Sequence, residues 1–210
     1  MMMESLLLSV FFKILCGYIA LMSEKANKSP KERIILGIDP GTSIMGYGII
    51  LIKQKELKLI QYGVIHLNKY KDHNIKLSKI FERTTQLIEE YMPDEMAIEA
   101  PFYGKNIQSM LKLGRAQGVA IAAAIARQIP ICEYLPKKVK QSVTGNGNAS
   151  KEQVSAMLLK LLNFKKEAPE LLDATDALGV AVCHYFQNGK VEKKTKGWTA
   201  FLKENPDRIK

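Results

Sequence analysis

Ile34-Ile35-Leu36-Gly37-Ile38-Asp39-Pro40-Gly41-Thr42 is the stretch that decides the fold. Its run of β-branched and aliphatic residues predicts a buried strand, and Pro40-Gly41 predicts a tight turn directly after Asp39. Apolar residues resume from Ile44 to Ile52, so we expect a hairpin that displays Asp39 at the rim of a sheet. An acid beside this much apolar surface is costly unless a cation meets it. The turn alone leaves a second interpretation open, in which Asp39 only caps the turn through its side chain.

Outward from the hairpin, strands and helices alternate along the chain. Apolar periodicity predicts strands at 57–67, 96–98 and 131–135 and helices at 75–91 and 105–127. Ser150 with Gln153 three residues later predicts a capping box at the start of another helix, and Pro169 opens the final helix. The helix at 105–127 is apolar on most sides, which indicates either complete burial or a dimer interface.

Composition narrows the class of protein. A chain of 210 residues suits one domain of ordinary size with additional residues at its ends. The net charge of +10 favours a polyanionic partner, either nucleic acid or an anionic membrane surface. The three cysteines and three histidines are scattered, so we expect no disulfide framework and no zinc site, as suits a reducing cytoplasm.

The two ends of the chain differ from its middle. The apolar leader contains Glu4 and no basic residue before its apolar stretch, and that stretch is short for a membrane span of about 20 residues. We therefore expect the working protein to start at Met22, without a membrane segment. The predicted organisation is an N-terminal extension at 1–30, one folded domain at 31–188 and a basic, disordered tail at 189–210.

Carboxylates recur where apolar elements end or begin. Glu99 follows a short strand, as Asp39 does, and Asp173 and Asp176 are spaced i, i+3 on one face of the final helix. Each has an ordinary alternative role, because Glu99 can be an edge residue and the two aspartates can complement the helix dipole. Beside so apolar a helix, however, two carboxylates repel each other and resist burial. A divalent cation would resolve both problems.

Together, these four acids are the ligand set that a pair of Mg²⁺ ions needs. Two such ions can hold an attacking water and stabilise the leaving oxygen of a phosphodiester. Basic residues follow at Lys137, Lys138, Lys140 and Lys151, where they could bind flanking phosphates. A solvated lysine face is the alternative interpretation of that cluster.

Five segments taken in order resemble one family. They are Gly37-Ile38-Asp39-Pro40-Gly41, Ala97-Ile98-Glu99, Leu113-Gly114-Arg115-Ala116-Gln117-Gly118, Val139-Lys140-Gln141 and Asp173-Ala174-Thr175-Asp176-Ala177. The set resembles the RuvC family of Holliday-junction resolvases over about residues 33–187. The resemblance implies an α/β, RNase H-like fold, with a mixed five-stranded sheet flanked by helices on both sides. It also implies a cytoplasmic homodimer that cuts two opposed strands of a four-way DNA junction in recombination and repair. Its cofactor would be Mg²⁺, two ions per active site with Mn²⁺ as a substitute, and its partner proteins RuvA and RuvB.

Position by position, the resemblance assigns roles to individual residues. Asp39, Glu99, Asp173 and Asp176 match the family's metal-binding acids, and Lys140 and Lys151 match basic residues near the scissile phosphate. Phe102 matches an aromatic that stacks on bases at the junction centre, although it or Tyr103 could instead pack the loop. Tyr103, Lys105, Lys137 and Lys138 complete the expected DNA-binding set. The leader and the lysine-rich tail have no match in the family.

Three rival interpretations remain at this level. Sugar kinases and actin-like ATPases share the Asp-x-Gly-Thr pattern, but they need a duplicated domain that 210 residues cannot hold. A junction- or RNA-binding module without a metal site would keep the basic charge, and four intact acids argue against it. A membrane-anchored peripheral protein is supported only by residues 1–21. Magnesium-dependent cleavage would separate the resolvase from all three.

Overall fold

The computed structural model describes residues 32–54, 56–101, 106–163 and 172–187. The described residues from Arg33 onward belong to one compact unit. Several predictions fall outside these residues: the start at Met22, the extension at 1–30, the tail at 189–210, and Pro169. Across the described residues, no helix is both long enough and apolar enough to cross a membrane.

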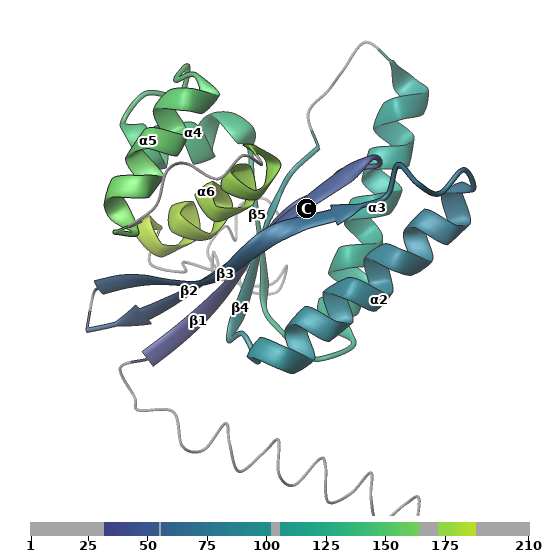
Figure 1. Ribbon diagram of the computed structural model, residues 1–210, viewed down its shortest axis with the longest axis horizontal. Helices are drawn as coiled ribbons and strands as arrows, with labels where there is room; N and C mark the ends of the chain where they lie inside the picture. Colours follow the sequence, from purple (N-terminus) through teal and green to yellow (C-terminus); the bar gives the residue numbers. More distant parts are fainter. Residues whose placement is uncertain (1–31, 55, 102–105, 164–171, 188–210) are drawn as a thin grey trace, which may run out of the picture. The chain divides into compact units, whose positions relative to one another are not determined.

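A mixed sheet of five strands forms the centre of the fold (Figure 1). The strands follow the order β3-β2-β1-β4-β5, in which β2 and β3 are antiparallel while β4 is parallel to both β1 and β5. The prediction of a mixed five-stranded sheet is therefore confirmed. The bounds are β1 (Glu32–Asp39), β2 (Ile44–Lys53), β3 (Glu56–His66), β4 (Glu95–Glu99) and β5 (Ile131–Tyr134).

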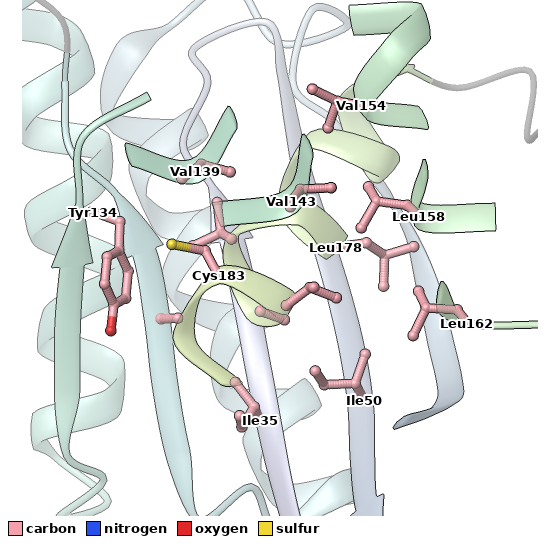
Figure 2. Packing of buried hydrophobic residues seen from close by; sticks show 14 of the residues in the cluster. Ile35, Ile50, Tyr134, Val139, Val143, Val154, Leu158, Leu162, Leu178 and Cys183 are labelled. Carbon is pink, nitrogen blue, oxygen red and sulfur yellow. The ribbon is translucent and has the colours of Figure 1, made fainter. Parts of the chain in front are cut away.

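Helices cover both faces of this sheet. Helices α2 (His73–Tyr91) and α3 (Ile107–Ile125) pack on one face, over a core that includes Leu36, Ile38 and Ile98. Helices α4 (Pro136–Thr144), α5 (Lys151–Leu161) and α6 (Leu172–Phe186) pack on the other (Figure 1). Figure 2 shows that second core, where Leu178 and Cys183 of α6 lie among apolar side chains from the sheet, α4 and α5.

Two glycines let α6 lie directly on the sheet. A Cβ atom added at Gly37 of β1 would lie 2.2 Å from the carbonyl oxygen of Ala177, and one at Gly48 of β2 would lie 2.6 Å from Leu178. Both distances are too short for any side chain. The absence of side chains at these positions therefore determines how closely α6 approaches β1 and β2.

Local signals explain most helix ends. The predicted capping box of α5 is confirmed, since Ser150 accepts from the Gln153 amide and the Gln153 side chain accepts from the Ser150 amide. Helix α4 was not predicted from the sequence. It begins with Pro136 in its first turn and is followed by Gly145, whose positive φ of 80° suits glycine at a helix end.

Candidate active site

Asp39 and Glu99 lie side by side at the same edge of the sheet. They end β1 and β4, which are parallel, and the register pairs Ile38 with Ile98 immediately before them. Because side chains alternate along a strand, and Ile38 and Ile98 point into the core under α2 and α3, the two acids point toward the α6 face. Neighbouring strands are about 4.8 Å apart, so Asp39 and Glu99 occupy adjacent positions at the same end of the sheet.

Helix α6 brings a third acid to this edge. Asp176 precedes Ala177, whose carbonyl lies against Gly37 of β1. Asp173 is one helical turn before Asp176, and its side chain lies outside the described residues. The close contact between α6 and β1 therefore places the start of this helix beside the strand ends that carry Asp39 and Glu99.

Electrostatics ties Glu99 to the other groups of the site. Burial, and after it the Asp176 carboxylate, raise the pKa of Glu99 to about 7, whereas Lys151 and Lys140 oppose the rise. Lys151 also donates to Asp176 at 2.5 Å, in an ion pair between α5 and α6. The structure thus brings together Glu99, Asp176, Lys140 and Lys151, which were predicted from distant parts of the sequence.

The remaining predicted residues divide into two groups. Lys137 and Lys138 are exposed on α4; Lys137 lies over Gly147, and the Lys138 carbonyl lies beside the Cys183 thiol, two helical turns along α6 from Asp176. Phe102, Tyr103 and Lys105 lie outside the described residues. That segment connects Glu99 to α3, whose N-cap is Asn106.

Sequence reasoning missed two sets of polar contacts, one at the strand ends that carry the acids and one under α6 that reaches the other end of β4. Gln117 of α3 donates to the Glu133 carboxylate at 2.9 Å and to the Glu99 carbonyl at 3.5 Å. Glu133 is paired in register with Ile98, so it lies at the same edge as Glu99 but on the opposite face of the sheet. No local pattern marked Glu133, because its partner is on a helix that is not adjacent to it in sequence.

The second missed contact is a buried chain of hydrogen bonds under α6. Nδ1 of His184 lies 2.7 Å from the Tyr134 hydroxyl, and Nε2 of the same ring lies 3.0 Å from the Glu95 carboxylate. The chain links α6 to β5 and β4, the strand that carries Glu99. A single histidine at the end of an otherwise apolar helix was the signal that could have found it.

The donor chemistry of the site suits a hard divalent cation. Carboxylate oxygens are the ligands that Mg²⁺ and Mn²⁺ prefer, and the neighbouring Asp176 carboxylate makes ionisation of Glu99 more costly, a cost that a bound cation would offset. Within the residues whose side chains are described, no three His, Cys, Asp or Glu side chains form a ready metal cluster. The Asp173 side chain is not among the described ones. The argument that these residues suit a divalent cation therefore rests on the carboxylate chemistry of the donors.

Comparisons with known proteins agree on one family. The family model described as "Crossover junction endodeoxyribonuclease RuvC" matches residues 35–184. A protein of that description from Cytophaga hutchinsonii is 73% identical over 184 residues, covering 87% of this chain and 92% of the relative. One from Bacteroides fragilis is 56% identical over 183 residues, covering 86% and 97%.

Solved structures give the same result. The structure titled "T. thermophilus RuvC in complex with Holliday junction substrate" superposes with a TM-score of 0.70 at 29% identity, covering 74% of this chain and 94% of that one. A yeast mitochondrial Holliday junction resolvase, Ydc2, superposes with a TM-score of 0.56 at 16% identity, covering 86% and 87%, and supports the fold alone.

Proposed function

The chain belongs to the RuvC family of crossover junction endodeoxyribonucleases, and on that premise we propose that it resolves Holliday junctions through Asp39, Glu99, Asp173 and Asp176. The observation that carries this proposal is the convergence of Asp39 and Glu99 at two adjacent parallel strand ends that face α6. Asp176 on that helix is close enough to raise the pKa of Glu99. An RNase H-like sheet with acids at this edge suits hydrolysis of a phosphodiester.

The four acids would hold two Mg²⁺ ions, with Mn²⁺ as a substitute. When bound, such ions activate water and stabilise the leaving oxygen of a phosphodiester. The protein would contribute the positions of the four carboxylates, which β1, β4 and α6 carry. At a pKa of about 7, Glu99 is half protonated at neutral pH, so a cation that bound it would displace the proton from the protonated half of the molecules.

Basic residues around the acids would hold the DNA backbone. Lys140 lies on α4 and Lys151 begins α5, and both act electrostatically on Glu99. We assign them to the phosphates next to the cut, because an ammonium group there offsets the repulsion between the acids and DNA. Lys137, Lys138 and Lys105 would extend this contact, and Phe102 and Tyr103 would stack on unpaired bases at the junction centre.

The enzyme would act as a homodimer. A four-way junction has approximate two-fold symmetry, so two related active sites match two symmetric cuts. Helix α3 offers the interface: Ile107, Leu111 and Ile125 are 65%, 49% and 62% exposed along one face, and Gly114 and Gly118 lie in the same stripe. We place this dimer in the cytoplasm, with RuvA and RuvB as its partners on the junction.

The test uses protein that starts at Met22, a labelled four-way junction and a linear duplex of matching sequence, each with Mg²⁺ or EDTA. We expect paired, symmetric nicks in the junction only, in the presence of Mg²⁺. Asp39→Asn should lower cleavage by roughly a hundredfold or more while junction binding persists. Tight junction binding without cuts across many flanking sequences would contradict the proposal and indicate a binding module.

A further inference from the structure

A groove lies between the end of β3 and the middle of α2, on the sheet face opposite the acids. It has a volume of about 370 Å³, and Lys69, Tyr70, Lys79, Glu82 and Arg83 are among its lining residues. Three of these side chains are cationic and one is acidic. The groove is therefore a basic surface that the family resemblance did not assign.

The described contacts leave much of this positive charge uncompensated. Lys69 lies over the Tyr70 ring at 5.2 Å, and Arg83 lies 5.8 Å from the Tyr47 ring and donates to the Gln86 side chain. These partners are uncharged, and in the part of the chain that the structure describes neither cation forms an ion pair. Lys79 differs, because it pairs with Glu82 at 2.6 Å.

Three hydrogen bonds, two from backbone amides and one from a lysine side chain, fix the groove to the turn that follows Asp39. The amides of Leu67 and Asn68 both donate to the Ser43 carbonyl, at 2.8 and 2.9 Å. Lys76 of α2 donates to the Thr42 carbonyl at 3.0 Å. The loop that carries Lys69 is therefore held against the turn at 40–43, at the edge of the sheet where Asp39 and Glu99 end their strands.

The separation suits a DNA strand. β3 is two strands away from β1, a distance of roughly 10 Å. A DNA strand presents one phosphate per about 3.4 Å of helix axis, so a strand held at Asp39 that crosses the turn would reach the groove about three to five phosphates from the cut.

We propose that this groove is a second phosphate-binding site, which holds the backbone of a junction arm a few nucleotides from the cut. The inference rests on the proposed function, since it assumes that a junction strand lies at Asp39. Lys69 and Arg83 would contact the phosphates, and Glu82 would weaken the contact by neutralising Lys79 and repelling the backbone. The occupant is nucleic acid backbone because cationic side chains outnumber acidic ones in the lining, where Glu82 is the acid.

Binding of the four-way junction in EDTA tests the groove without cleavage. Lys69→Gln and Arg83→Gln should each weaken binding by roughly threefold to tenfold and lower the salt dependence by about one phosphate contact. Glu82→Gln should do the opposite and tighten binding by roughly threefold, because it removes an acid and releases Lys79. The matched control is Lys58→Gln, at an exposed position near the other end of β3, which should leave binding unchanged.

A second arm of the experiment locates the contact on the DNA. Junctions that carry one uncharged methylphosphonate in place of a phosphate are bound to the wild-type protein and to Lys69→Gln. The wild type should lose affinity when a phosphate three to five positions from the cut is neutralised, and the variant should not lose it again there. Three results would each contradict the proposed phosphate site. The first is an equal loss of affinity in Lys58→Gln and Lys69→Gln, and the second is an unchanged affinity in Glu82→Gln. The third is that the wild type and Lys69→Gln lose affinity at the same neutralised phosphates. Junction-specific cleavage by the wild type would meanwhile show that the proposed function stands without it.

Discussion

The pKa of Glu99 is set by groups that act in opposite directions. Burial is the main reason that its pKa rises to about 7, and the Asp176 carboxylate adds to the rise. Lys151 and Lys140 act in the other direction. The metal-free protein therefore carries this carboxyl protonated below pH 7 and ionised above it.

This pKa predicts a pH-dependent stability in EDTA. Since the folded-state pKa lies above the ordinary value of 4.5, Glu99 favours folding at low pH, and that advantage is lost as the pH rises through 7. Glu99→Gln should match the wild type in thermal unfolding at pH 5 and exceed it at pH 8.5. A difference in melting temperature that stays constant from pH 5 to 9 would contradict the assignment.

Lys151 should influence the same titration through its charge. Lys151→Gln removes a cation that lowers the pKa of Glu99, so the acidic limb of the pH profile of cleavage should move to higher pH. Single-turnover rates on the junction from pH 5.5 to 9 measure this limb. Lys138→Gln on α4 is the control, because Lys138 is not among the groups that act on Glu99, and an equal shift in both variants would refute the role of Lys151.

For single residues, the sequence predicted where the acids lie but not whether each is protonated. Asp39 and Glu99 were recognisable because each ends an apolar run, and Asp176 because it shares a helix face with Asp173. The ionisation of Glu99 was beyond prediction, since it depends on how deeply the packed helices bury it and on an acid from a distant element.

Among the elements, α6 determines the geometry of the site. It carries Asp176, lies on β1 and β2 through Gly37 and Gly48, and is joined to β4 and β5 by the buried His184 chain. Any change in its height above the sheet moves Asp176 relative to Asp39 and Glu99.

Gly37→Ala tests this contact. The new Cβ would lie 2.2 Å from the Ala177 carbonyl and 2.9 Å from the Ala181 side chain, so α6 must move away from β1. We expect a loss of about 1–3 kcal/mol in the free energy of unfolding and a larger proportional loss of cleavage.

Gly118→Ala on α3 is the matched control for packing within one chain, because its Cβ would meet no other atom of the same chain within 4 Å. It should raise stability by about 0.5–1 kcal/mol, as expected for alanine in a helix. Urea unfolding compares the two variants. Wild-type stability and cleavage in Gly37→Ala would show that α6 does not rest on β1 as described.

Local patterns predicted most elements and missed one. The strands and the helices α2, α3 and α5 had clear periodicity or a capping box. Helix α4 has nine residues and buries only Val139 and Val143, so its lysines obscured a short apolar stripe. Pro136 at its start and Gly145 at its end were the available signals.

For the whole molecule, local patterns carry less information. The hairpin of β2 and β3 follows from adjacency in sequence, but the pairing of β1 with β4 joins segments that no local pattern connects. The resemblance to a family implied a mixed five-stranded sheet but not the order of its strands, which the structure gives as β3-β2-β1-β4-β5. The assembly of two chains likewise cannot be read from one sequence, because an apolar helix face can be buried in either of two ways.

Gly118→Glu tests the proposed dimer. The position is exposed and open, and glutamate favours helix more than glycine does, so the folded monomer should tolerate it. Two such charges at a two-fold interface would repel each other, and light scattering should show monomers. Lys112→Glu, an exposed position of the same helix away from the apolar stripe, should remain dimeric. A dimeric Gly118→Glu protein would exclude this face. Ile121→Glu is a poorer probe, because Ile121 also packs against the core.

The central claim is that four carboxylates from β1, β4 and α6 form one metal centre. The most direct test is Mn²⁺ binding, followed by electron paramagnetic resonance, in Asp39→Asn, Glu99→Gln, Asp173→Asn and Asp176→Asn. Glu133→Gln is the control, because this acid lies at the same sheet edge on the opposite face, where it accepts from Gln117. We predict that each of the four variants binds Mn²⁺ at least about tenfold more weakly than the wild type while Glu133→Gln binds normally. Wild-type Mn²⁺ binding in any of the four, or an equal loss in Glu133→Gln, would contradict the claim.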